Sequence, residues 1–283
     1  MYRTSMYRTS MCAAAALFMA SQAEAQEKVS FPSTDGDLKG GTPTTINGYL
    51  YKPAGSGPFA AVISLPGGQG LVDEKGGIHP LHRQWGEILS GAGYIVLLVD
   101  PFRPRGYTSL DDPGFSVLPD REMPRDAFGA MNYLRSRSDV RPNSIAIMGQ
   151  SYGGAATLST IANGALPKDV KDFRAAVAFY PGCMRIQDAH WRPRQPMLLL
   201  MGESDDFGSL ARCKEFVAGG PPIDAHFYPN TYHAFDWPNL PRTVVTNAKV
   251  PPDGHSPTIG SNPEARADAI NRVTQFLAKQ LPQ

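Results

Sequence analysis

Apolar residues along this chain fall into short runs that alternate with helical patterns. The run at 94–99 (YIVLLV) is almost wholly apolar, which is typical of a strand buried on both faces. Residues 125–138 instead place Phe128, Met131 and Leu134 three positions apart, which predicts an amphipathic helix. The same criteria predict strands at 46–52, 59–65, 94–99, 144–148, 174–179, 197–201 and 223–228. They predict helices at 81–90, 125–138, 152–163, 208–218 and 263–281.

This alternation predicts the fold class. Apolar strands joined by helices form a mostly parallel central sheet with helices on both faces, which is the α/β class. We find no linker, repeat or low-complexity tract within 26–283, and we therefore expect a single domain there. The irregular stretch at 229–262 is long enough to be a lid or a binding loop.

Composition and charge exclude several classes of protein. The 283 residues contain 27 Lys and Arg against 26 Asp and Glu, a formal net charge of +1, without the basic excess of a nucleic-acid-binding protein. Apolar residues make up 42% and charged residues 19%, which is a globular composition. No apolar run approaches the ~20 residues of a membrane span. Metal-binding and nucleotide-binding motifs are absent, so we expect no metal and no cofactor.

The first 25 residues have the pattern of a secretory signal peptide. Arg3 and Arg8 precede a short apolar run at 12–20, and Ala23-Glu24-Ala25 is a small-x-small cleavage pattern. An N-terminal helix of the domain is the alternative. We expect removal of residues 1–25 and export to the periplasm or outside the cell, where disulfides persist.

The sharpest motif is Gly149-Gln150-Ser151-Tyr152-Gly153, which lies between a predicted strand and a predicted helix. This G-x-S-x-G pattern in a strand–turn–helix context is the nucleophile elbow of serine hydrolases. The tight turn requires small residues on both sides and exposes the serine at a helix N-terminus, where negative charge is stabilised. Ser151 is therefore the candidate nucleophile.

A serine nucleophile needs a base, and the base needs an acid that orients it. In this fold the acid follows a later strand and the histidine follows the last one. Asp205, after the predicted strand at 197–201, is the candidate acid, with Asp206 and then Glu203 as alternatives. His233, after the strand at 223–228, is the candidate base, and His82 is the strongest rival.

An oxyanion hole requires two backbone N–H donors. The residue after the nucleophile, Tyr152, is expected to supply one. The Gly-rich loop after 59–65 is expected to supply the other, from Gly68 or alternatively from Gly67 or Gln69. These residues complete the set needed for acyl transfer.

Further residues are candidates for substrate binding or for a disulfide. Arg103 and Arg105 follow the strand at 94–99, so their guanidinium groups could bind an anionic substrate. Trp237 could line an aromatic or acyl pocket, or simply pack in the core. Cys183 and Cys213 could form a disulfide, remain as two buried thiols, or include one reactive thiol.

The chain resembles the dienelactone hydrolase family within the α/β-hydrolase superfamily. The matching stretches cover most of residues 45–281 and lie at 65–71, 100–106 (DPFRPRG), 149–154, 179–183 (FYPGC), 202–206, 228–236 (YPNTYHAFD) and 262–281. The resemblance implies Asp205 and His233 as the partners of Ser151, and it suggests that Cys183 and Cys213 lie close together. Founding members carry cysteine where this chain has Ser151.

These observations predict a serine hydrolase that cleaves carboxylic esters or lactones, acting on a small-molecule substrate without a cofactor. One alternative is a serine peptidase or amidase with the same triad. Another is a non-catalytic binding protein with the hydrolase fold. The acyl and alcohol groups of the substrate, and the oligomeric state, do not follow from the sequence.

Overall fold

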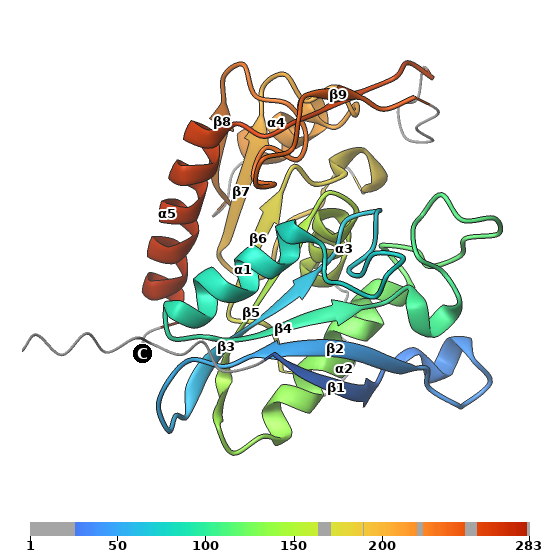
Figure 1. Ribbon diagram of the computed structural model, residues 1–283, viewed down its shortest axis with the longest axis vertical. Coiled ribbons are helices and arrows are strands. Elements are labelled where there is room, and N and C mark those ends of the chain that lie inside the picture. The colour runs from blue at the N-terminus through green and yellow to red at the C-terminus, as the bar shows by residue number, and fades with distance from the viewer. Residues whose placement is uncertain (1–25, 164–170, 189, 220–222, 247–253, 282–283) are drawn as a thin grey trace, which may run out of the picture.

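Eight strands form one twisted sheet in the computed structural model (Figure 1). The sheet order is β1-β2-β4-β3-β5-β6-β7-β8. The strands are β1 Glu27–Pro32, β2 Thr45–Tyr51, β3 Phe59–Leu65, β4 Ile95–Asp100, β5 Val140–Gln150, β6 Ala175–Phe179, β7 Met197–Gly202 and β8 Ile223–Tyr228. Pairs β1–β2 and β2–β4 are antiparallel, and every other pair in this sheet is parallel. The predicted mostly parallel sheet is confirmed.

The structure describes residues 26–163, 171–188, 190–219, 223–246 and 254–281. The expected signal peptide at 1–25 lies outside the described residues. None of the described helices is both long enough and apolar enough to cross a membrane.

Helices cover both faces of the sheet, as the sequence pattern predicts (Figure 1). They are α1 Pro80–Gly91, α2 Glu122–Ser136, α3 Tyr152–Ile161, α4 Leu210–Ala218 and α5 Pro263–Gln280. On one face, α1 meets α5 where Arg266 Nε donates a 2.8 Å hydrogen bond to Gln84 Oε1. Helix α2 packs against α3 on the other face. The result is an α/β/α sandwich around one core.

Strand β1 was not predicted from the sequence. It is an edge strand in which only Val29 and Phe31 point into the core, while its other four residues are exposed. The stretch at 229–262, expected to be irregular, contains a second, two-stranded antiparallel sheet made of β9 (Thr243–Val244) and β10 (Thr258–Ile259).

The parallel strands β3, β5, β6, β7 and β8 all end at the same edge of the sheet. Because side chains that follow the carboxyl ends of parallel strands meet in one crevice, this edge is where a ligand site is expected in an open α/β sheet. The loops that follow these five strands carry the candidate catalytic residues predicted from the sequence, whereas Arg103 and Arg105 follow β4.

Candidate active site

Ser151 lies in a sharp turn between β5 and α3. Its backbone has φ 53° and ψ −112°. Residues other than glycine rarely adopt this conformation and do so only where the surroundings enforce it. The turn is closed so tightly that a Cβ atom on Gly149 would lie 2.1 Å from the carbonyl oxygen of Gly153. A Cβ atom on Gly153 would lie 2.3 Å from the carbonyl oxygen of Leu65 on β3. Both glycines are therefore required by the geometry that presents Ser151.

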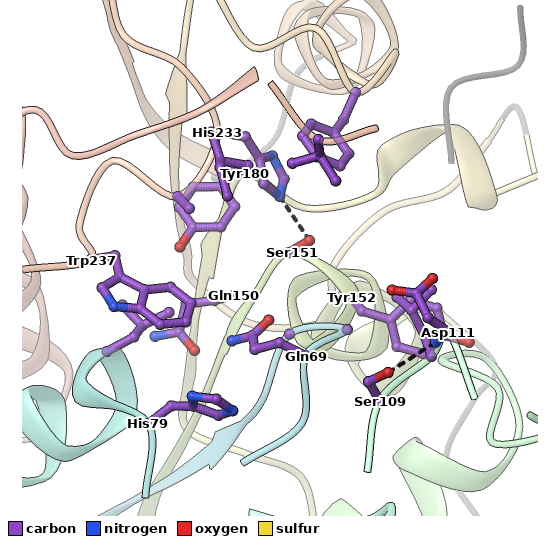
Figure 2. Close-up of a pocket in the computed structure, with 18 of the residues that line it drawn as sticks. Gln69, His79, Ser109, Asp111, Gln150, Ser151, Tyr152, Tyr180, His233 and Trp237 are labelled. Atoms are coloured by element: carbon purple, nitrogen blue, oxygen red, sulfur yellow. Dashed lines mark hydrogen bonds between the residues drawn. The ribbon is translucent and has the colours of Figure 1, made fainter. Parts of the chain in front are cut away.

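His233 and Asp205 complete a continuous hydrogen-bonded chain with Ser151 (Figure 2). His233 Nε2 lies 2.8 Å from Ser151 Oγ, and His233 Nδ1 lies 2.7 Å from Asp205 Oδ2. The imidazole and the carboxylate are both buried. Since the Asp205 carboxylate accepts from Nδ1–H, Nε2 of a neutral imidazole is free to accept the serine proton.

The loops that carry the acid and the histidine are held against each other. The backbone N–H of Ser204 donates to the carbonyl of Thr231 over 3.0 Å. A Cβ atom on Gly202 would lie 2.1 Å from the same Thr231 oxygen, so only glycine permits this approach. This contact sets Asp205 and His233, which are 28 residues apart, at hydrogen-bond distance.

The alternative acids, Asp206 and Glu203, take no part in the hydrogen bonds that join Ser151, His233 and Asp205. Asp206 instead accepts a 2.8 Å hydrogen bond from the backbone N–H of Thr258 on β10. Glu203 pairs with Lys214 at the surface over 3.2 Å. Both side chains therefore have structural partners outside the Ser151–His233–Asp205 set.

The rival histidine, His82, lies on α1 beneath the Gly-rich loop. Its side chain is fully buried, and this burial lowers the pKa of His82 to about 3, so the imidazole is neutral. His82 Nε2 lies 3.2 Å from Nε2 of Gln69, the residue after Gly68. His82 thus contacts the candidate oxyanion loop and is not hydrogen-bonded to Ser151.

Two backbone donors predicted for the oxyanion hole lie at the cavity. In the described part of the chain, neither the Gly68 N–H nor the Tyr152 N–H donates to a protein acceptor. The carbonyl of Gly68 accepts from the N–H of Leu110 over 2.8 Å, which holds the loop in place. A Cβ atom on Gly68 would lie 1.8 Å from Leu110 Cδ2, so the Leu110 side chain would have to move to admit any other residue here.

A cavity of about 760 Å³ opens above Ser151. Figure 2 shows Gln69, His79, Gln150 and Trp237 on one side of Ser151, with Tyr152, Ser109 and Asp111 on the other. Trp237 lines the cavity as predicted, with its ring centroid 5.8 Å from that of His79. Most of the wall is apolar or aromatic, formed by Val72, Leu81, Leu110, Tyr152, Tyr180, Met184, Phe207, Ala234, Trp237, Leu240, Val245 and Ile259.

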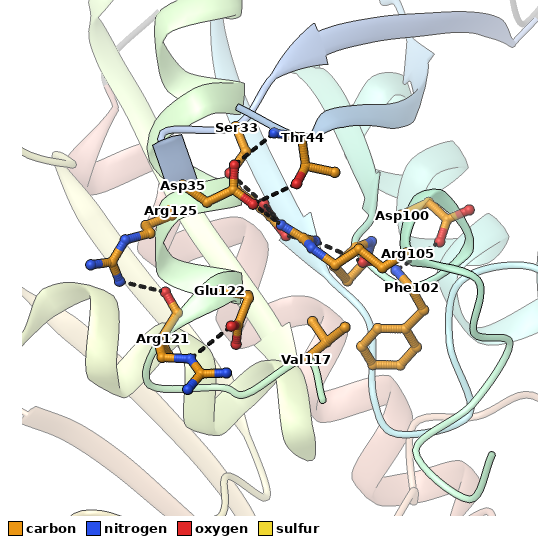
Figure 3. Close-up of polar contacts among 12 residues, drawn as sticks. Ser33, Asp35, Thr44, Asp100, Phe102, Arg105, Val117, Arg121, Glu122 and Arg125 are labelled. Atoms are coloured by element: carbon orange, nitrogen blue, oxygen red, sulfur yellow. Dashed lines mark hydrogen bonds and ion pairs between the residues drawn. The ribbon is translucent and has the colours of Figure 1, made fainter. Parts of the chain in front are cut away.

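The prediction that Arg105 binds substrate is wrong in this structure. Its guanidinium forms ion pairs with Asp126 over 2.7 Å and Asp35 over 2.9 Å, and its side chain is 7% exposed (Figure 3). Arg103 donates to the backbone carbonyl of Asp73. Neither arginine lines the cavity. Both side chains bond to acceptors within the protein, and they thereby anchor the loop after β4.

Cys183 and Cys213 form a disulfide, with Cα atoms 5.4 Å apart. Both cysteines are fully buried, and the bond joins the loop after β6 to α4. Met184 and Arg185, directly after the first cysteine, line the cavity. The disulfide therefore fixes one wall of the cavity.

Sequence reasoning missed three residues around the imidazole, which are Tyr180, Phe207 and Asp236. Tyr180 and Phe207 lie against the His233 ring, and Asp236 accepts a hydrogen bond from Tyr180. Tyr180 directly follows β6, so its place after a strand end was an available signal. Within the described ranges, no group of three or more His, Cys, Asp or Glu side chains is arranged to hold a metal ion.

Two curated proteins match parts of this chain. Esterase EstD of Thermotoga maritima is 32% identical over 117 residues, which are 40% of this chain and 27% of that protein. A probable 2-oxo-3-(5-oxofuran-2-ylidene)propanoate lactonase of Bradyrhizobium sp. is 27% identical over 140 residues, 47% of this chain and 50% of that protein. The matches thus span about a quarter and a half of these relatives.

Solved structures share the fold at low sequence identity. A dienelactone hydrolase-like promiscuous phosphotriesterase from metagenomic libraries has a TM-score of 0.64 at 20% identity, covering 90% of this chain and 99% of its own. Dipeptidyl peptidase 4 of Porphyromonas gingivalis has a TM-score of 0.62 at 17% identity, covering 92% of this chain and 36% of its own.

The family match covers nearly all of the sheet, and it includes Ser151, Asp205 and His233. The profile of the dienelactone hydrolase family matches residues 46–281. This range leaves out β1 and the first residue of β2, and it includes the rest of the main sheet. The chain therefore belongs to the dienelactone hydrolase family, a family of hydrolases, and it has the α/β-hydrolase fold.

Proposed function

We propose that this protein is a serine hydrolase that cleaves carboxylic esters or lactones by two-step acyl transfer. One observation carries the proposal, which is the hydrogen-bonded chain from Ser151 Oγ through His233 to Asp205, with distances of 2.8 and 2.7 Å. A hydroxyl, a base and an orienting acid in that order are what nucleophilic catalysis by serine requires.

In the first step, Ser151 Oγ attacks the carbonyl carbon while His233 Nε2 takes its proton. Asp205 holds the imidazole in the correct tautomer and stabilises the imidazolium that forms. The N–H groups of Tyr152 and Gly68 donate to the oxyanion, and the positive end of α3 adds to this stabilisation. His233 then protonates the leaving alcohol, and water releases the acyl group by the reverse sequence.

The cavity supports an ester or lactone with apolar groups as substrate. Its walls are mostly apolar, and Arg103 and Arg105 are occupied by protein acceptors, whereas Arg185 lines the cavity. The similarity to an esterase and to a probable lactonase supports the same substrate class. The support for a peptidase function is weaker, because it consists of the fold shared with dipeptidyl peptidase 4 at 17% identity.

The test is steady-state kinetics on matched substrates. Wild-type protein is expected to hydrolyse p-nitrophenyl acetate and butyrate and to leave the matched p-nitroanilides almost untouched. Ser151→Ala and His233→Gln are each expected to lower kcat by at least about 10³-fold with little change in melting temperature. Unchanged ester hydrolysis by Ser151→Ala would refute the proposal, and faster cleavage of the anilides would favour an amidase.

We also propose that the protein is exported after removal of residues 1–25. The disulfide between the buried Cys183 and Cys213 supports this, because such bonds persist in oxidising compartments. Mass spectrometry of protein recovered from the periplasm or medium is expected to find an N-terminus at Gln26. Recovery of the full-length chain in the cytoplasm alone would contradict it.

A further inference from the structure

The imidazole of His233 is enclosed between two aromatic rings. Phe207 stacks on one side with centroids 4.1 Å apart and an interplanar angle of 25°. Tyr180 lies 4.4 Å away at an angle of 56°. Asp205 and Ser151 hold the edge of the same ring through hydrogen bonds. The imidazolium that forms during catalysis is therefore surrounded by aromatic faces, which attract a cation.

Tyr180 is held in a strained conformation that brings its ring to this place. Its φ of 33° lies in the left-handed region, which a bulky residue rarely adopts. Its backbone N–H donates to the carbonyl of Leu200 on β7 over 2.7 Å, which ties the turn to the neighbouring strand. Non-glycine residues stay in this region only when their surroundings enforce it, and they gather at functional sites.

The hydroxyl of Tyr180 leads to a second buried carboxylate. Tyr180 Oη lies 2.5 Å from Asp236 Oδ1, and Trp85 Nε1 donates to Asp236 Oδ2 over 2.8 Å. Asp236 has no exposed surface. Within the described residues it forms no ion pair with a Lys, Arg or His side chain, so both of its partners are uncharged. Burying a carboxylate without a cation to pair with it costs free energy, which hydrogen bonds offset only in part.

We propose that Tyr180 and Asp236 are positioning residues for His233, in which Asp236 acts through Tyr180 to hold the imidazole and to stabilise its protonated form. The inference rests on the proposed function of His233 as the base. A tyrosine that donates a hydrogen bond to a carboxylate carries more electron density on its ring, and this strengthens its attraction for the adjacent imidazolium.

If the Asp236 side chain had only a structural role, its replacement would leave the acid limb of the pH profile unshifted. Asp236 also joins the loop after β8 to α1, since Gln84 Nε2 donates to its backbone carbonyl over 2.6 Å. That link uses the backbone and survives a change of the side chain. The variants Tyr180→Phe and Asp236→Asn keep the ring and the side-chain volume respectively. Tyr180→Phe removes the hydroxyl, and Asp236→Asn removes the negative charge and replaces one of the two acceptor oxygens with an NH2 group.

The charged and titratable groups around this pair define what a pH profile reports. Those facing His233 are Asp205, Tyr180 and, through Tyr180, Asp236. Asp236 itself contacts Tyr180 after β6 and two uncharged residues of α1, Trp85 and Gln84, and Arg266 on α5 bonds to Gln84. Helix α1 also carries the titratable residues His82, Arg83 and Glu87. Burial raises the pKa of Asp236 and holds the pKa of Tyr180 well above its usual value.

The experiment compares the pH dependence of hydrolysis in the two variants with that of wild type. Loss of the nearby negative charge disfavours the imidazolium, so the acid limb of kcat/KM is expected to move down by about 0.5 on the pH scale in Asp236→Asn. We expect kcat to fall about three- to tenfold in each variant, while KM stays within about twofold. Tyr228→Phe is the matched control.

The control removes an equivalent hydrogen bond away from the site. Tyr228 Oη lies 2.9 Å from Asp268 Oδ2, and among the described residues the rings that lie against His233 are those of Tyr180 and Phe207, not that of Tyr228. Its pH profile is expected to superimpose on that of wild type. An unshifted acid limb in Asp236→Asn and Tyr180→Phe, with or without a lower melting temperature, would overturn the proposal.

A second measurement separates this proposal from the proposed function. Histidine ring NMR, with the signal of His233 identified by its loss in His233→Gln, follows protonation without any substrate. The midpoint for His233 is expected to be lower in Asp236→Asn than in wild type even if no ester is hydrolysed. An equal midpoint in the two proteins contradicts the role of Asp236, whatever the activity.

Discussion

Arg105 offers a sharp test of the structure, because the sequence predicts substrate binding and the structure shows a buried anchor. The perturbation is Arg105→Met, which keeps most of the side-chain length and removes the guanidinium. Four hydrogen bonds are lost, two to Asp126, one to Asp35 and one to the carbonyl of Pro101. The carboxylates of Asp35 and Asp126 have no exposed surface, so water cannot replace the lost partner.

The magnitude follows from what remains around the two carboxylates. Removing one member of a buried ion pair costs about 3–5 kcal/mol of unfolding free energy. Asp126 keeps its bond from Ser33, and Asp35 keeps two from Thr44. The lower end, about 3 kcal/mol, is therefore expected, which corresponds to a fall in melting temperature of about 6–12 °C for a domain of this size.

The assay is urea unfolding followed by circular dichroism, combined with ester kinetics under conditions where the variant is folded. We expect the unfolding free energy to fall and KM to stay within about twofold of wild type. Arg125→Met, which breaks the more exposed pair with Asp37, is the control and is expected to have a much smaller effect. A KM raised tenfold or more with unchanged stability would refute the structural assignment and restore the substrate-binding prediction.

Three further predictions address the oxyanion loop, the buried histidine and the disulfide. Gly68→Ala places a Cβ atom 1.8 Å from Leu110 Cδ2, so kcat is expected to fall about 10²-fold with KM little changed, and Leu110→Ala is expected to restore part of the loss. The pKa of His82 is about 3 in the folded protein and about 6.5 when unfolded, so the unfolded chain binds more protons and stability falls as pH drops below about 6.5. In urea unfolding at pH 4 to 7, His82→Gln is expected to flatten this slope, and an unchanged slope would contradict the assignment. Replacing both Cys183 and Cys213 by Ser opens a bridge across 30 positions and is expected to lower the unfolding free energy by about 2–4 kcal/mol, whereas an equal midpoint in urea would show that the bond contributes nothing.

The sheet could be predicted from the sequence because its central strands are buried on both faces. Strand β4 is buried at every residue, and its apolar run is therefore visible in the sequence without any partner. Strand β1 was missed because an edge strand buries only alternate residues, here Val29 and Phe31. Two inward positions within six residues are too weak a pattern to stand out.

The position of Ser151 could also be predicted, because the glycines around it are a local requirement of the turn. Asp205 and His233 followed from chain order and the strand ends. Long-range partners did not follow. The acids that bind Arg105 lie 21 and 70 residues away in the sequence, and nothing local to Arg105 indicates them.

The environment of the imidazole was equally hidden from the sequence. The contact of Tyr180 with His233 depends on a left-handed backbone at Tyr180, a residue type that seldom adopts it. Asp236 lies three residues after His233, yet its partners Trp85 and Tyr180 come from α1 and from the end of β6. Only the packed fold brings these three elements together.

Covalent labelling shows whether Ser151 is the nucleophile. Folded wild-type protein is treated with a fluorophosphonate and digested, and the modified peptide is sequenced by mass spectrometry. The proposed mechanism predicts a single adduct on Ser151, absent from Ser151→Ala and formed far more slowly in His233→Gln. A folded wild-type protein that remains unlabelled, or an adduct on another residue that persists in Ser151→Ala, would contradict it.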